Sequence, residues 1–137
     1  MLNYCLDTNI ISEILRGNET IKQRLIDEVK GGNTYSICII AYYEILRGLN
    51  LKDLNRKLDA FKTFYEKAYN HFLLDERAAK KAAEIYANLK SKGLKVGDSD
   101  NDIYIAAISI VNDCTLVTAN TRHFERVEGL NFVNWRE

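Results

Sequence analysis

Hydrophobic positions along this chain follow two alternating patterns. Short, continuous apolar runs are typical of buried strands, and they cover residues 4–6, 35–40, 72–74, 115–117 and 130–133. Between the runs, apolar residues return every three or four positions, which is the spacing of one helix face. This spacing predicts helices over residues 10–15, 21–29, 42–49, 51–68, 75–92 and 98–110. Glycines stand where several of these helices should end, at positions 17, 31, 32 and 93.

Strands that alternate with helices favour the α/β class. We expect a parallel central sheet of about four to five strands, flanked by helices on both faces, because each parallel connection must cross back over the sheet. The 137 residues are enough for one domain with its own core, so residues 1–137 are predicted to form a single domain. The order of the strands does not follow from the pattern.

Charge and composition narrow the choice of partners. Lys and Arg together number 19, as do Asp and Glu, so the chain has no basic excess with which to bind nucleic acid. RNA binding would need a local basic strip, metal ions or a second subunit. No apolar run is long enough to cross a membrane and the first residues do not resemble a signal peptide, so a cytoplasmic protein is expected. The three cysteines lie in apolar runs, which predicts buried, reduced thiols.

Acid or amide side chains stand at four places where a strand ends or a helix begins. They are Asp7, Glu44, Asp102 with its neighbours Asp98 and Asp100, and Asn120. Taken singly, each has an ordinary role, such as capping a helix or facing solvent. In a parallel sheet, however, the carboxyl ends of the strands lie at one edge, so these side chains are expected to meet there.

Several carboxylates in one place repel one another unless a cation neutralises them. Hard oxygen ligands suit Mg²⁺ or Mn²⁺, which also bind substrate phosphate. Such ions polarise a phosphoryl oxygen and lower the pKa of a bound water, as phosphodiester hydrolysis requires. Neither His71 nor His123 lies at ligand spacing from the acids, which argues against zinc.

Six segments in order resemble the PIN-domain family, and within it the VapC-type toxins of bacterial toxin–antitoxin pairs. They are Leu2–Asn9, Tyr43–Gly48, Lys95–Gly97, Asp102–Ala107, Leu116–Phe124 and Val127–Trp135. Each segment alone is weakly specific, but together they span nearly the whole chain. The resemblance implies a PIN-like fold and a metal-dependent endoribonuclease that cleaves RNA phosphodiester bonds, acting on tRNA or rRNA.

The resemblance also implies roles for particular residues. The catalytic, metal-binding acids would be Asp7, Glu44 and Asp102, with Mg²⁺ or Mn²⁺ as the cofactor. Accessory positions would be Asp100, Asn120, Thr8 and Thr118. Many family members have a fourth acid where this chain has Asn120, and this departure weakens the case for a second tightly bound metal. The two threonines would support the site by hydrogen bonds.

Family members also have protein partners. The resemblance implies a symmetric homodimer and a cognate VapB-type antitoxin whose flexible segment wraps the toxin and places a basic residue among the acids. Apolar side chains near Ile10–Leu15 and Leu51–Phe64 are expected to line the groove for that segment.

Two other functions fit part of the pattern. Asp7-Thr8-Asn9 begins like the nucleophile motif of haloacid-dehalogenase-type phosphatases, but Asn9 stands where that mechanism needs a general acid, and Glu44 is left without a role. A non-catalytic binding module of the PIN fold is the second alternative. Loss of the carboxylates would indicate it, and all three are present.

Overall fold

The computed structural model describes residues 1–52, 54–95, 97 and 99–136. Its strands are β1 (Asn3–Leu6), β2 (Thr34–Cys38), β3 (His71–Phe72), β4 (Thr115–Val117) and β5 (Phe132–Val133). Its helices are α1 (Thr8–Leu15), α2 (Glu19–Lys30), α3 (Ile39–Leu51), α4 (Asn55–Glu66), α5 (Glu76–Ser91), α6 (Asp100–Val111) and α7 (Thr121–Phe124). Asp98 lies outside the described residues.

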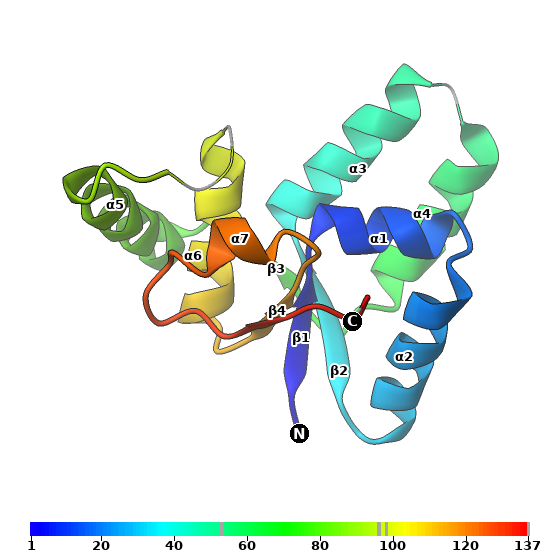
Figure 1. Cartoon of the computed structure of the whole chain (residues 1–137). Coiled ribbons are helices and arrows are strands. Elements are labelled where there is room, and N and C mark those ends of the chain that lie inside the picture. Colours follow the sequence, from blue (N-terminus) through cyan, green and yellow to red (C-terminus); the bar gives the residue numbers. More distant parts are fainter. Residues whose placement is uncertain (53, 96, 98, 137) are drawn as a thin grey trace.

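The strands form one parallel sheet in the order β3-β2-β1-β4-β5. In register, Cys5 of β1 lies beside Ser36 of β2 and Leu116 of β4. Figure 1 shows α1, α2 and α4 on one side of the strands and α5 and α6 on the other. The predicted α/β class, the parallel sheet and the helices on both faces are therefore confirmed. The first strand occupies the centre, so whatever follows β1 lies in the middle of the sheet edge.

The core surrounds the three inner strands. Leu6, Ile37 and Leu116 are fully buried, as expected where helices cover both faces of a parallel sheet. Cys5, Cys38 and Cys114 are free and buried, which confirms their predicted state. In the part of the chain described here, no helix combines the length and apolar character needed to cross a membrane.

Several element boundaries differ from the sequence pattern. The strands predicted over residues 72–74 and 130–133 are shorter in the structure, since β3 covers His71–Phe72 and β5 covers Phe132–Val133. Helix α3 begins at Ile39, so the predicted strand 35–40 is two residues too long. Hydrophobic periodicity could not locate the boundary between β2 and α3, because a short apolar run is equally compatible with a strand and with a buried helix. The predicted helix 51–68 is also too long, since α3 continues to Leu51 and α4 begins at Asn55. The four-residue helix α7 was not predicted, being too short to show a period.

Candidate functional site

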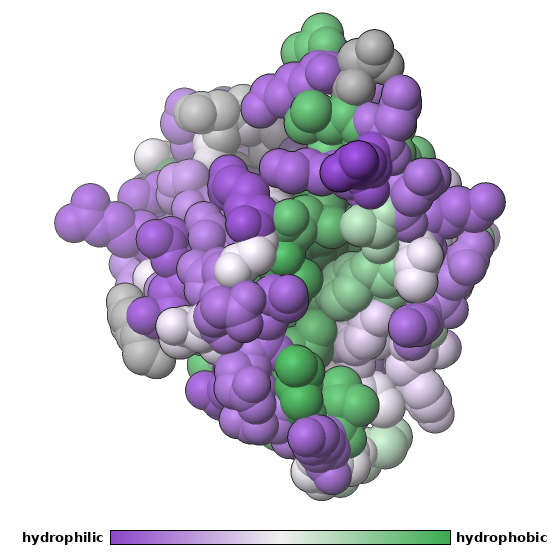
Figure 2. All heavy atoms as spheres, turned by 90° about the vertical axis from the view of Figure 1, so that its right-hand side faces the viewer, coloured by the Kyte–Doolittle hydropathy of each residue, from purple (hydrophilic) through white to green (hydrophobic). Residues whose placement is uncertain are grey.

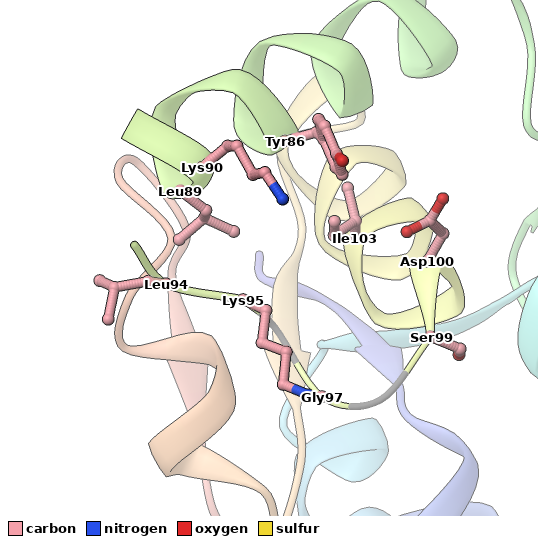
Figure 3. Close-up of a pocket in the computed structure, with 9 residues that line it drawn as sticks. All are labelled: Tyr86, Leu89, Lys90, Leu94, Lys95, Gly97, Ser99, Asp100 and Ile103. Carbon is pink, nitrogen blue, oxygen red and sulfur yellow. The ribbon is translucent and has the colours of Figure 1, made fainter. Parts of the chain in front are cut away.

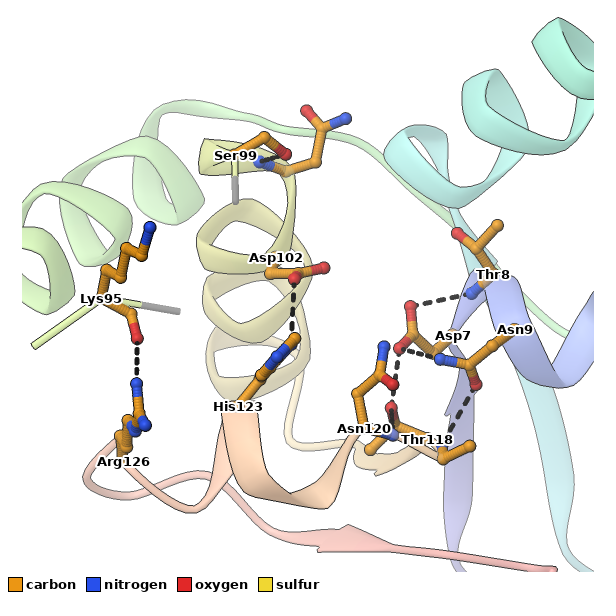
Figure 4. A network of polar contacts seen from close by, with 12 residues as sticks. Asp7, Thr8, Asn9, Lys95, Ser99, Asp102, Thr118, Asn120, His123 and Arg126 are labelled. Atoms are coloured by element: carbon orange, nitrogen blue, oxygen red, sulfur yellow. Dashed lines mark hydrogen bonds and ion pairs between the residues drawn. The ribbon is translucent and has the colours of Figure 1, made fainter. Parts of the chain in front are cut away.

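Asp7 is the centre of a buried hydrogen-bond network at the carboxyl end of β1. Its side chain is 2% exposed, and its Oδ1 accepts the backbone N–H of Thr8 at 2.8 Å, capping α1. Its Oδ2 accepts the Thr118 hydroxyl at 2.7 Å and the Asn9 Nδ2 amide at 3.1 Å. Asn9 in turn accepts the backbone N–H of Ala119 at 3.0 Å, so the network joins β1 and α1 to the chain that leaves β4 (Figure 4). These donors hold the carboxylate in one orientation.

Burial raises the pKa of the Asp7 carboxyl, and the negative charge of Glu44 raises it further. The hydrogen bonds from Thr118, Thr8 and Asn9 act in the opposite direction, because they stabilise the ionised form. A buried carboxylate that is well supplied with donors but next to a second acid is stabilised when a cation lies between the two. The electrostatics of Asp7 thus favour a bound cation.

Glu44 connects three helices from the second turn of α3. Its Oε1 accepts the Thr8 hydroxyl at 2.7 Å, and its Oε2 accepts the Asn101 amide at 3.4 Å. Thr8 belongs to α1 and Asn101 to α6, so the glutamate is held between elements that lie on opposite sides of the sheet. Thr8 also links the two acids, since its backbone binds Asp7 and its side chain binds Glu44.

Asp102 approaches the site from α6 and faces α7. Its Oδ2 lies 3.7 Å from His123 Nδ1, which is beyond hydrogen-bond length but within range of an ion pair if the imidazole is protonated (Figure 4). The His123 Nδ1 atom is buried and has no hydrogen-bond partner among the described residues. Gly97 packs directly against Asp102, and a Cβ at position 97 would overlap the carboxylate. Sequence spacing did not predict this histidine beside an acid, because α7 itself was not predicted.

The predicted accessory residues do not all lie beside Asp7 at the carboxyl edge of the sheet. Asp100 precedes Asp102 by two residues, about 200° around a helix, and its side chain lines a groove between α5 and α6 (Figure 3). Asn120 is exposed, and its backbone N–H donates to the Thr118 hydroxyl at 3.0 Å. The hydrogen bonds of Asn9 to Asp7 and of Asn101 to Glu44 were not predicted from the sequence, although both asparagines lie close to an acid in the chain.

The residues present fit a hard divalent cation. Asp7, Glu44 and Asp102 offer carboxylate oxygens, which Mg²⁺ and Mn²⁺ prefer, and a single histidine lies nearby. Among the described residues, no three His, Cys, Asp or Glu side chains are already grouped closely enough to enclose an ion. Mg²⁺ usually keeps several waters and contacts only one or two carboxylates, so the wider spacing suits a hydrated ion.

A groove leads away from the acids between α1, α3 and α4. It has a volume of about 170 Å³ and begins at Thr8 and Glu44. Leu15 and Leu54 give it an apolar wall. Its cationic residues are Arg16, Lys52 and Lys57. Viewed from this side of the molecule, apolar atoms form a band bordered by polar ones (Figure 2). The groove lies where the sequence analysis expected a partner segment.

Comparison with known proteins identifies the family. The sequence model of the PIN domain family matches residues 4–130 of this chain. The chain belongs to the PIN-domain family. This PIN domain is 33% identical over 107 residues to Ribonuclease VapC1 of Methanocaldococcus jannaschii, covering 78% of this chain and 72% of that relative. It is 30% identical to Ribonuclease VapC2 of Rickettsia felis, covering 96% of this chain and 97% of that relative. Within the family, the PIN domain described here belongs with the VapC ribonucleases.

Solved structures agree with this assignment. The PIN domain superimposes on a chain of VapBC2 from Rickettsia felis bound to a promoter DNA fragment, with a TM-score of 0.88 and 26% identity over 98% of this chain and 99% of that one. For DNA-bound VapBC from Salmonella typhimurium the TM-score is 0.85 at 29% identity, with the same coverage of both chains. The predicted PIN-like fold is confirmed, and the haloacid-dehalogenase alternative is wrong.

Proposed function

We propose that this chain is a metal-dependent endoribonuclease and the toxin of a toxin–antitoxin pair. The observation that carries the proposal is that a VapC-family chain keeps three acids on elements that converge at one sheet edge. Asp7 follows the central strand, Glu44 lies in α3 and Asp102 in the first turn of α6. A non-catalytic binding module would not need to hold a buried carboxylate against its desolvation cost.

Asp7, Glu44 and Asp102 would hold Mg²⁺ or Mn²⁺. When bound, such an ion polarises a phosphoryl oxygen and makes a bound water more acidic. The chain's own residues have the task of positioning: Thr118 and Asn9 orient Asp7, while Thr8 and Asn101 orient Glu44.

The test is cleavage of purified RNA with and without divalent ions. Wild-type protein should cleave with Mg²⁺ or Mn²⁺ and stop in excess EDTA, and Asp7→Asn should keep the fold but lose activity and toxicity on expression. As a second readout, Mn²⁺ should raise the melting temperature of the wild type, because an ion that binds only the folded state stabilises it. The Asp7→Asn form should show a smaller increase. Undiminished cleavage in EDTA, or equal toxicity of the two proteins, would overturn the proposal.

We propose that the protein meets its RNA substrate in the cytoplasm. We infer a structured RNA such as tRNA or rRNA, because unpaired loops present splayed bases to a small protein. Sequencing the 5′ ends that appear after brief expression of the toxin should reveal one dominant site in tRNA or rRNA. Cleavage spread evenly over messenger RNA would contradict this choice.

We infer that a VapB-type antitoxin occupies the groove between α1, α3 and α4. The support is its apolar wall next to the acid Glu44, which matches a segment that buries apolar anchors and places an arginine on a carboxylate. Replacing Glu44 by Lys should weaken the complex, because the new cation repels the inserted one. Affinity should be measured at two salt concentrations. If the variant binds as tightly as the wild type, the antitoxin does not reach the acids.

We also infer a homodimer, formed through the outer face of α3. Ile39, Tyr43, Leu46 and Leu51 form an apolar surface there, and Tyr43 is 52% and Leu51 85% exposed. A two-fold contact between such faces would bury them in both copies. Light scattering at micromolar concentration should give the mass of a dimer, and Leu46→Asp should give a monomer. A monomeric wild type would refute the inference.

A further inference from the structure

A second groove reaches the acidic site from the opposite side of the molecule. It lies between α5 and the start of α6 and has a volume of about 220 Å³. Figure 3 shows Tyr86 and Lys90 of α5 facing it, with Lys95 on the chain that follows α5. Asp100 and Ile103 of α6 line the other side. None of these five side chains takes part in the network around Asp7.

Gly97 joins this groove to the acids. It lines the groove and at the same time packs against the carboxylate of Asp102. Because Asp100 and Asp102 lie on nearly opposite faces of α6, one faces the groove and the other faces the site. Gly97 therefore places the groove directly beside the carboxylate of Asp102.

The lining of the groove matches an unpaired nucleotide. Tyr86 is half exposed and lines the groove, so its ring can stack on a base that enters there. Lys90 extends its ammonium group into the groove (Figure 3), and such a group pairs with phosphate. The backbone of Lys95 is fixed to the segment that follows α7, since its carbonyl accepts Arg126 Nη1 at 2.8 Å. Asp100 can accept a hydrogen bond from a base amino group.

We propose that this groove is a subsite for one nucleotide that flanks the cleaved bond. The base stacks on Tyr86, the adjoining phosphate pairs with Lys90, and Asp100 favours bases with an amino group over uracil. The subsite rests on the proposed ribonuclease function and deepens it. It gives a chain with no net charge a local contact for RNA, because the Lys90 ammonium group faces the groove beside the site.

The experiment compares cleavage of single-stranded oligonucleotides of increasing length on each side of the cut. Losing one stacked base costs about 1–3 kcal/mol, so Tyr86→Ala should raise KM about 5- to 150-fold with kcat little changed. Tyr86→Phe keeps the ring and should restore the wild-type KM. A substrate that lacks the flanking nucleotide should have the same KM for wild type and Tyr86→Ala, because the contact is already absent.

Binding to the cleavage-deficient Asp7→Asn protein gives a second readout. Adding Lys90→Gln should lower the slope of log affinity against log salt by about 0.7, the value for one phosphate contact on a single strand. Two matched controls are available. Lys81→Gln removes a lysine from the same helix that pairs with Glu84 instead, and Tyr69→Ala removes a tyrosine that is 60% exposed elsewhere. Both controls should behave as wild type.

The outcomes separate the two proposals. If the wild type cleaves no RNA with Mg²⁺ or Mn²⁺, the proposed function fails and the subsite fails with it. If the wild type cleaves but Tyr86→Ala and Lys90→Gln leave KM and salt slope unchanged, the subsite alone is wrong. If these variants weaken antitoxin binding but not RNA binding, the groove belongs to the antitoxin and the RNA subsite is refuted.

Discussion

The acidic site has two halves that differ in how far the carboxylates are exposed to solvent. On the β1 side, Asp7 is buried and accepts three hydrogen bonds of 2.7–3.1 Å. On the α6 side, the Asp102 side chain is 22% exposed, and the neighbouring His123 stands 3.7 Å away. The first, buried half is preorganised by these hydrogen bonds, while the second, open half can be reached from solvent. A hydrated ion and an RNA strand would need both, because a fixed ligand sets the position of the ion and an open side admits the substrate.

Removing the Thr118 hydroxyl should have the largest effect on RNA cleavage. Thr118→Val deletes the 2.7 Å hydrogen bond to Asp7 while keeping the shape of the side chain. We expect RNA cleavage to fall about 10- to 100-fold, which is typical when the partner of a metal ligand is lost. Thr118→Ser keeps the hydroxyl and should stay close to wild type. Equal activity of the valine and wild-type proteins would mean that the buried half is not held by this bond.

Gly97→Ala tests the open half, around Asp102, and should have a smaller effect. Its Cβ would overlap the Asp102 carboxylate, which would have to rotate away, so we expect cleavage to fall roughly tenfold. Position 97 has a φ of +60°, so any side chain also adds backbone strain. Gly93→Ala is the matched control, because its φ is +69° and a Cβ there meets no atom within 4 Å. If both variants lose activity equally, strain rather than displacement of Asp102 is responsible.

The smallest expected effect is on stability, and it concerns the buried half alone. Since burial raises the pKa of Asp7, the protonated form contributes stability below the ordinary Asp pKa of about 3.9, and this contribution is lost as pH rises through the folded-state pKa. In EDTA, wild type should therefore lose unfolding free energy relative to Asp7→Asn between about pH 4 and about pH 7. Urea denaturation at the two pH values measures it. A difference between the proteins that does not change with pH would show that Asp7 is not desolvated.

The buried half around Asp7 was largely predictable from the sequence, whereas the open half around Asp102 was not. Asp7 directly follows a strand, so its place at the sheet edge depends only on the parallel topology. Asp102 could be named only through the family resemblance, because three acids in five residues compete for the same helix start. The rotation of α6 about its axis determines which of the three acids faces the site. Neighbouring residues of a helix point about 100° apart, so a small error in the predicted helix selects the wrong acid.

Contacts between distant segments were the hardest to predict. The approach of His123 to Asp102 depends on α7, whose four residues have no detectable period. Asn101 reaches Glu44 across 57 positions, and no pattern along the chain marks that pair. Sequence periodicity predicts which elements form, whereas side-chain pairing at the site depends on how those elements pack.

The central position of β1 has a consequence for the synthesis of the protein. Asp7 directly follows β1, and its hydroxyl partner Thr118 leaves the ribosome 111 positions later. At about 5–20 residues per second, translation separates the two by several seconds. During that interval β1 lacks its neighbour β4, and neither Asp102 nor Thr118 has joined the site. A growing chain of this topology therefore has no complete acidic site until Asp102 and Thr118 have been added and β4 has paired with β1.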